Sequence, residues 1–167
     1  MQEETKSKAH TELFVVRSMD VQLNNFCNAD CFFCVAHSKD LNPCIDFKGF
    51  ETIAKNVHME TVEELILTGG EPTVNKDLDR ILRFSSEQYP QTKIRLITNA
   101  IHMPPKLIDS LLLGNVASIN ISINASNAKD YNRIMRIDRF EKVVENIRTI
   151  IKEEGGKTVT PWYVPHW

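Results

Sequence analysis

Residues 64–72 have the sequence Glu-Leu-Ile-Leu-Thr-Gly-Gly-Glu-Pro, a short apolar run that leads directly into two glycines. An apolar run of this length that ends at a pair of glycines predicts a buried strand followed by a turn. A helical pattern comes next, with Leu78, Ile81 and Leu82 at the spacing of one helix face. The stretch therefore predicts one strand–turn–helix unit, in which the turn lies at the carboxyl end of the strand.

The same unit recurs on both sides of this stretch. Strands are also expected over residues 15–23, 93–98 and 116–124, helices over 47–57, 104–112 and 139–152, and a fifth strand is expected to begin at Thr158. Successive strand–helix units predict an α/β fold with a parallel sheet and right-handed crossovers. Because ligands bind at the carboxyl ends of the strands in such folds, functional residues are expected in the turns that follow the strands.

The fourth predicted strand has one face that is polar throughout. Its isoleucines alternate with Ser118, Asn120, Ser122 and Asn124. A strand buried between helices and a filled core would be apolar on both faces. Two interpretations follow: an edge strand with a solvated face, or a sheet whose inner surface lines a polar ligand cavity. The motifs described below favour the cavity.

The composition is that of one globular domain. The 167 residues are 42 % hydrophobic, which is enough for a core, and the net charge of −2 gives no reason to expect nucleic acid or an anionic membrane as a partner. No apolar run is long enough to span a bilayer, and residues 1–10 lack the apolar segment of a signal peptide. We therefore expect a cytoplasmic protein in which residues 1–13 are a disordered lead-in.

Three of the four cysteines, Cys27, Cys31 and Cys34, lie in the loop after the first predicted strand, with the spacing C-x3-C-x2-C. In a reducing compartment, clustered cysteines are more often metal ligands than disulfide partners. Thiolates at these intervals can bind three irons of a [4Fe–4S] cluster, and a missing fourth thiolate leaves one iron open for a ligand. Phe32 and Phe33 can shield such a cluster from water, which affects its reduction potential.

Two other interpretations of the cysteines remain open at this point. One is a structural zinc site that takes Cys44 or His37 as its fourth ligand, which would belong to a binding module without catalysis. The other is plain burial, which three cysteines in one loop make a poor explanation. We expect Cys44 to be a half-buried packing residue, because the three-cysteine set is complete without it.

The cysteine spacing, with Phe33 directly before the third cysteine, resembles that of the radical S-adenosylmethionine (radical SAM) enzymes. Gly69-Gly70-Glu71-Pro72 is similar to the Gly-Gly-Glu-Pro motif of that family. Two later segments also match: Thr98-Asn99-Ala100 resembles a Thr-Asn-Gly segment, and Ser122-Ile123-Asn124 resembles a Ser-Leu-Asp segment. Asn124 replaces the usual aspartate, so that it can accept a hydrogen bond but brings no charge.

The resemblance implies the site and the chemistry. The cluster ligands would be Cys27, Cys31 and Cys34, and the contacts to S-adenosylmethionine would come from Phe33, Gly69, Gly70, Glu71, Pro72, Thr98, Asn99, Ser122 and Asn124. An electron from the cluster, delivered by a donor such as flavodoxin or ferredoxin, would cleave the cofactor. The resulting 5′-deoxyadenosyl radical would take a hydrogen atom from a peptide or small-molecule substrate whose identity the sequence does not give.

The family also implies a partial TIM-type barrel of six parallel (βα) units. This chain is similar in its core to the molybdenum-cofactor cyclase and the peptide-modifying maturases, and it offers four to five such units, which suggests a truncated radical SAM core over residues 14–160. Residues 161–167 contain two prolines and are expected to be an irregular aromatic tail. An incomplete sheet has an open edge with unpaired backbone groups, at which a dimer can form. The alternative is a fragment that binds its cofactors without turnover.

Overall fold

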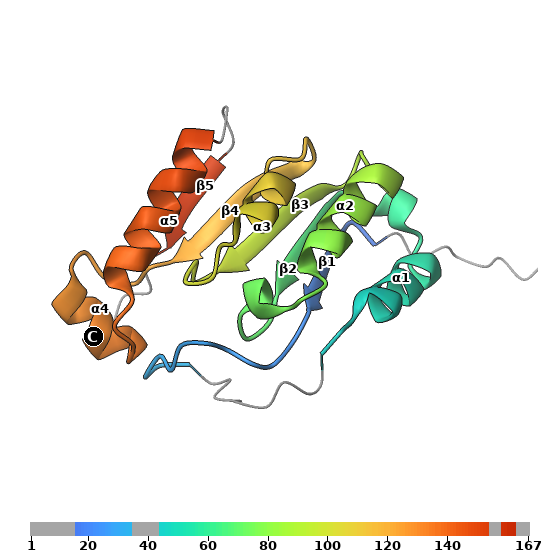
Figure 1. Ribbon diagram of the computed structural model, residues 1–167. Coiled ribbons are helices and arrows are strands. Elements are labelled where there is room, and N and C mark those ends of the chain that lie inside the picture. The colour runs from blue at the N-terminus through green and yellow to red at the C-terminus, as the bar shows by residue number, and fades with distance from the viewer. Residues whose placement is uncertain (1–15, 35–43, 154–157, 163–167) are drawn as a thin grey trace, which may run out of the picture.

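The computed structural model describes residues 16–34, 44–153 and 158–162. Its five strands form one parallel sheet in the order β1-β2-β3-β4-β5 (Figure 1). The strands are β1 (Ser18–Gln22), β2 (Glu64–Thr68), β3 (Lys93–Thr98), β4 (Val116–Ser122) and β5 (Thr158–Trp162). Strands that neighbour each other in the sequence therefore also pair in the sheet, as in a partial radical SAM barrel.

Helices connect the strands. The α-helices are α1 (Phe47–Asn56), α2 (Leu78–Gln88), α3 (Pro105–Leu111), α4 (Ala128–Met135) and α5 (Phe140–Glu153), and two 3₁₀ turns are η1 (Met59–Thr61) and η2 (Pro72–Val74). Figure 1 shows α2, α3 and α5 side by side across one face of the sheet. Within the described residues, no helix is long and apolar enough to cross a membrane.

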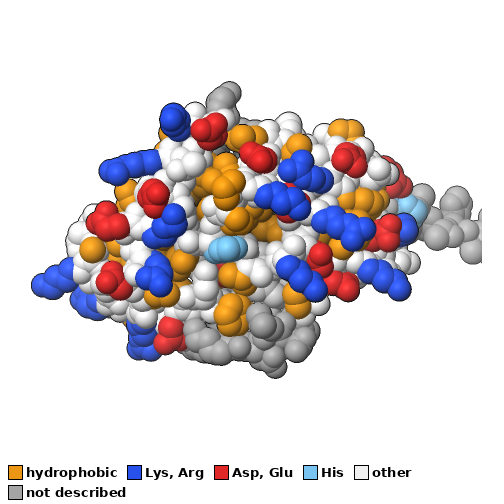
Figure 2. Space-filling model, viewed as in Figure 1, with side chains coloured by type: hydrophobic (Ala, Val, Ile, Leu, Met, Phe, Trp, Pro, Cys, Tyr) orange, Lys and Arg blue, Asp and Glu red, His pale blue; other side chains and the backbone are white. Residues whose placement is uncertain are grey.

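The main core lies between the sheet and the layer of helices. Side chains from one face of the strands are fully buried there: Leu65, Leu67, Ile94, Leu96, Ile119 and Ile121. Helix residues such as Ile81, Leu111 and Val143 are also fully buried and complete this core. On the outer surface of the helices, positive and negative side chains are interspersed (Figure 2), as is usual for a solvated face.

The opposite face of the sheet is polar across several strands, as was predicted for the fourth strand alone. Thr68 on β2 donates to Asp20 on β1, with 2.8 Å between Oγ1 and Oδ1. Arg95 on β3 pairs with Glu64 on β2, with 2.5 Å between Nη2 and Oε1. Asn120 on β4 lies on the same polar face. The alternation in the fourth strand therefore marks a polar inner surface that spans much of the sheet.

Several predicted boundaries were wrong. The first strand, expected over residues 15–23, covers only Ser18–Gln22. The fourth strand ends at Ser122 and not at Asn124, because the Ile123 N–H turns back to the Ile121 carbonyl (3.0 Å) and Asn124 takes a left-handed conformation with φ 54°. The fifth strand includes Pro161, which was assigned to an irregular tail.

A proline is tolerated at this position because β5 is an edge strand, where alternate N–H groups need no partner in the sheet. Trp162, the next residue of the predicted tail, also belongs to β5 and pairs with Ser122. Residues 163–167 of that tail and the predicted lead-in over residues 1–13 lie outside the described residues.

Candidate functional site

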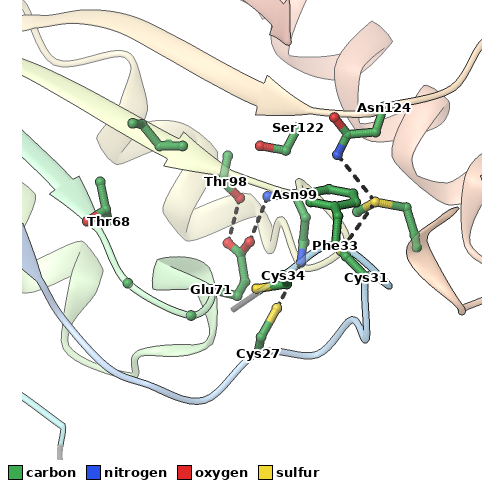
Figure 3. A pocket seen from close by; sticks show the side chains of 14 residues that line it. Cys27, Cys31, Phe33, Cys34, Thr68, Glu71, Thr98, Asn99, Ser122 and Asn124 are labelled. Carbon is green, nitrogen blue, oxygen red and sulfur yellow. Dashed lines mark hydrogen bonds between the residues drawn. The ribbon is translucent and has the colours of Figure 1, made fainter. Parts of the chain in front are cut away.

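One cavity lies at the carboxyl ends of β2, β3 and β4 (Figure 3). Its empty volume of about 630 Å³ includes space open to solvent. It brings together nearly all the sequence-predicted site residues: Cys27, Cys31, Phe33, Cys34, Gly69, Gly70, Glu71, Thr98, Asn99, Ser122 and Asn124. Pro72 does not line the cavity, because it is buried at the first position of η2.

The cysteine loop is fastened to the end of α4. The backbone N–H groups of Asp30 and Phe32 donate to the carbonyls of Met135 (3.2 Å) and Ile134 (3.1 Å). These are among the carbonyls that the end of a helix leaves without partners inside the helix. Arg136, with φ 53°, ends α4 immediately afterwards. The cysteine loop therefore caps α4, and α4 in turn holds the loop in place.

The three thiols lie close enough to influence one another. Burial, together with the negative charges of the nearby Cys27 and Cys34, raises the pKa of the Cys31 thiol to about 11. All three side chains are half-buried. Three thiolates in such a place are stable together only beside compensating positive charge, which iron supplies. The donor set therefore fits a metal cluster.

The spacing of the sulfurs bears on which metal fits. Across the described part of the chain, no three His, Cys, Asp or Glu side chains are grouped closely enough to hold a single metal ion. One zinc ion about 2.3 Å from each thiolate would require the sulfurs to be packed within about 4 Å of one another. An iron–sulfur cluster binds each cysteine to a different iron and so accepts wider spacing. The described residues therefore contain no preformed site for a single zinc ion.

Cys44 does not behave as predicted. Its side chain is exposed and not half-buried. It lies in an isolated antiparallel bridge with Asn24, and its Sγ accepts a hydrogen bond from Asn75 Nδ2 (3.4 Å). The bridge places Cys44 outside the core, which accounts for its exposure. His37, the other zinc ligand considered, lies outside the described residues.

A buried tyrosine that sequence analysis missed lies beside the thiols. Tyr131 on α4 is 0 % exposed, and its hydroxyl has no hydrogen-bond partner in the described structure. Burial raises the pKa of Tyr131, and the charges of Cys31, Glu71 and Cys27 raise it further, which places the hydroxyl in the electrostatic field of this site. A buried hydroxyl without a partner is costly, so this one fits a site that gains an acceptor when a cluster is bound.

The two glycines of the Gly-Gly-Glu-Pro turn allow two backbone segments to pack together. A Cβ atom on Gly70 would lie 2.2 Å from the carbonyl oxygen of Phe26, and one on Gly69 would lie 2.4 Å from that of Asn24. The Gly70 N–H donates to the Asn24 carbonyl (2.6 Å), and the Glu71 N–H donates to that of Phe26 (2.8 Å). The glycines therefore allow the turn to pack against the start of the cysteine loop. This role adds to the cofactor contact that the family resemblance implied for them.

Glu71 is a structural centre of the site. Its carboxylate is 1 % exposed. Oε1 accepts from the Thr73 backbone (3.0 Å), the Thr73 hydroxyl (2.7 Å) and the Thr98 hydroxyl (2.5 Å), and Oε2 accepts from the Asn99 backbone (2.6 Å). Figure 3 shows this carboxylate pointing at the end of β3. Glu71 therefore braces the turns after β2 and β3 against each other.

The hydroxyls of the cavity differ in what they can still offer a ligand. Thr68 gives its proton to Asp20, and Thr98 gives its proton to Glu71 while accepting from the Ala100 N–H (2.9 Å). A hydroxyl has one proton to donate. Ser122 makes no side-chain hydrogen bond to any described residue. Ser122 is thus the hydroxyl in this cavity with a proton available to a ligand.

The far side of the cavity is formed by sulfur and aromatic groups. Met135 on α4, which sequence analysis did not single out, places its Sδ 3.4 Å from Cys31 Sγ and accepts from Asn124 Nδ2 at 3.4 Å. Phe33 lines the cavity, whereas Phe32 is 46 % exposed and packs edge-on against Phe33 at 5.6 Å between ring centroids. Of the two rings expected to shield the cysteines, Phe33 is therefore the one that lines the site.

Comparison with known sequences places this site in a family. The family model described as "Radical SAM superfamily" matches residues 21–167. A probable GTP 3′,8-cyclase from Saccharolobus islandicus is 29% identical over 140 residues, which cover 81% of this chain and 44% of the relative. Another from Thermoplasma volcanium is 29% identical over 133 residues, covering 79% and 40%. The chain thus spans less than half the length of these curated relatives.

Comparison with solved structures agrees on the fold. The crystal structure of Streptococcus suis SuiB bound to S-adenosylmethionine matches with a TM-score of 0.72 at 20% identity, covering 88% of this chain and 34% of that one. Native anSMEcpe with bound AdoMet matches with a TM-score of 0.67 at 18% identity, covering 86% and 43%. The sequence match and the parallel sheet lead to one conclusion: the chain belongs to the Radical SAM superfamily.

Proposed function

We propose that this chain binds a [4Fe–4S] cluster on Cys27, Cys31 and Cys34, with S-adenosylmethionine beside it, and acts as a radical-generating enzyme. When bound, the cluster supplies the electron that cleaves the cofactor's sulfur–C5′ bond, giving methionine and a 5′-deoxyadenosyl radical that abstracts hydrogen from the substrate. One observation carries the proposal: the cysteine loop and the three motif turns, which are far apart in the sequence, line a single cavity.

The chain's own residues would hold the cofactor in a fixed frame. Ser122 has a hydroxyl proton that the methionine carboxylate or a ribose oxygen can accept. Thr98 has given its proton to Glu71, so it can only accept, from the ammonium or from a ribose hydroxyl. The buried carboxylate of Glu71 holds this wall rigid and adds negative charge near the ammonium. Phe33 limits the access of water, which protects a radical from side reactions.

The polar inner face of the sheet supports a substrate rich in hydrogen-bonding groups. Asp20, Arg95 and Asn120 lie on this face, below the cavity that Ser122 lines. An apolar substrate would remove water from these polar and charged groups without offering them a hydrogen bond, which is costly. We therefore propose a polar substrate, such as a peptide or a small polar molecule, and an electron donor of the flavodoxin or ferredoxin type.

The proposal is tested by anaerobic reconstitution with iron and sulfide, followed by incubation with S-adenosylmethionine and dithionite. We expect a brown protein with about four irons per chain and formation of 5′-deoxyadenosine. Cys31→Ala should lose both the iron and the product, whereas Cys44→Ala, in the exposed bridge, should keep both. A colourless wild-type protein would contradict the assignment, and a brown one that forms no 5′-deoxyadenosine would limit the chain to binding.

A further inference from the structure

We infer that Asn99 is a positioning residue for the cluster: its side-chain amide donates to the sulfur of Cys27 and so raises the reduction potential. The inference rests on the proposed function, because it needs a cluster on Cys27. It assigns the Asn99 side chain a place different from the cofactor contact that the family resemblance implied.

The geometry places the amide between the end of β3 and the cysteine loop. Asn99 Nδ2 lies 3.7 Å from Cys27 Sγ and 2.8 Å from Asn28 Oδ1. The residue is only 5 % exposed. Figure 3 shows the Asn99 side chain reaching down from the end of β3 toward Cys27. The two amide hydrogens therefore have two partners, both on the cysteine loop.

The surrounding hydrogen bonds fix which amide atom faces the sulfur. Asn99 Oδ1 accepts from the Ile101 N–H at 3.0 Å. If the amide were rotated by half a turn, two oxygens would face each other at Asn28 Oδ1, and the Ile101 N–H would face an NH₂ group. The donor nitrogen must therefore point at Cys27.

The backbone around Asn99 is held from two directions. Its own N–H donates to Glu71 Oε2 at 2.6 Å. Asn146 on α5 donates to the carbonyls of Ala100 (2.7 Å) and Ile101 (3.3 Å), which steadies a turn in which Ala100 has φ 57°. A side chain on such a braced turn keeps its direction when the ligands change, as a residue that positions a cluster must.

The cysteine sulfurs differ in their surroundings. Cys27 Sγ receives the Ala29 N–H at 3.4 Å as well as the Asn99 amide. Cys31 Sγ instead lies 3.4 Å from the thioether of Met135, which has no N–H to donate. Hydrogen bonds to cluster sulfurs stabilise the more negative, reduced state and raise the potential. The corner of the cluster at Cys27 is therefore the one that Asn99 tunes.

The inference is tested on the reconstituted protein without S-adenosylmethionine, by titrating the cluster potential with EPR detection. Asn99→Leu removes both amide hydrogens, and Asn99→Asp keeps the shape and the acceptor for Ile101 but places an oxygen opposite the sulfur. We expect the potential to fall in Asn99→Leu and to fall further in Asn99→Asp, which also adds negative charge. The EPR signal of the reduced cluster should change in both variants.

Asn146→Leu is the matched control, because it loosens the same turn without removing a group that contacts sulfur. Its potential should shift by less than that of Asn99→Leu, because the Asn99 N–H is still held by Glu71 and the amide is still present. A shift in Asn146→Leu as large as that in the Asn99 variants would overturn the inference in favour of a general structural role. The inference would also be overturned if pulsed EPR of wild-type protein labelled with ¹⁵N at its asparagine amides showed no ¹⁵N coupling to the cluster. Failure of the proposed function is distinct, since the wild type would then hold no cluster.

Discussion

The carboxylate of Glu71 accepts a hydrogen bond from the backbone N–H of Asn99, with 2.6 Å between Oε2 and N. This bond joins the Gly-Gly-Glu-Pro turn after β2 to the turn after β3. Because the Asn99 side chain also contacts Cys27 and Asn28, the cysteine loop is tied into the same unit. Three motifs that are far apart in the sequence are thus one hydrogen-bonded frame around the cavity.

The buried carboxylate of Glu71 gives the frame a characteristic pH dependence. Burial raises the pKa of Glu71, and the hydrogen bonds from Asn99, Thr73 and Thr98 oppose this rise without cancelling it. Between the ordinary and the raised pKa, the folded chain therefore retains a proton that the unfolded chain releases. The relevant pH window runs from the ordinary glutamate pKa of about 4.3 up to the raised pKa of Glu71 in the folded chain. Within this window, the free energy of unfolding of the wild type should fall with rising pH relative to that of Glu71→Gln.

Urea denaturation of both proteins at several pH values measures this difference. The pKa of Glu71 is not raised if the difference in the free energy of unfolding between wild type and Glu71→Gln is independent of pH. The same conclusion follows if this difference moves in favour of the wild type as the pH rises.

Gly70→Ala should destabilise the protein, because the new Cβ would lie 2.2 Å from a backbone oxygen of Phe26. We expect a loss of about 2–3 kcal/mol in the free energy of unfolding, together with displacement of the cysteine loop. Gly114→Ala is the control, since a Cβ there has no heavy atom within 4 Å, and its effect should stay within about 0.5 kcal/mol. Thermal and urea denaturation compare the two; equal effects would refute the packing role of Gly70.

Ser122→Ala should weaken binding of S-adenosylmethionine to the cluster-loaded protein. A hydrogen bond to a charged group contributes about 1.5–3 kcal/mol, which corresponds to about a 10- to 100-fold rise in Kd. Ser118→Ala lies on the same strand, does not line the cavity and should leave Kd unchanged. Anaerobic equilibrium dialysis measures both, and an unchanged Kd in Ser122→Ala would remove Ser122 from the binding site.

Tyr131→Phe should have opposite effects on the empty and the loaded protein. Without iron, removing a buried hydroxyl that lacks a partner should raise the free energy of unfolding by about 1 kcal/mol. With the cluster bound, the same change removes a donor, so iron should be lost faster to a chelator. Urea denaturation and the rate of bleaching measure the two effects. Destabilisation of the iron-free variant would mean that the hydroxyl already has a partner there.

Local patterns predicted the strands and most of the helices, and the family resemblance supplied most of the residues that line the cavity. The spacing of Cys27, Cys31 and Cys34 and the Gly-Gly-Glu-Pro turn are short-range signals, and parallel topology brings strand ends together without further information. The contact of Met135 with the Cys31 thiol, and the charge effect of the thiols on Tyr131, were not predictable, because both depend on how α4 docks against a loop about a hundred residues earlier. The packing role of Gly70 was missed for the same reason.

The measurement that tests the central claim most directly is electron–nuclear double resonance on the reduced cluster with S-adenosylmethionine labelled with ¹⁵N or ¹⁷O in its methionine group. A cluster held by only three cysteines has an iron free to bind that group. We predict ¹⁵N and ¹⁷O couplings that show direct ligation to iron. A loaded cluster that shows no such coupling at saturating cofactor would contradict the account.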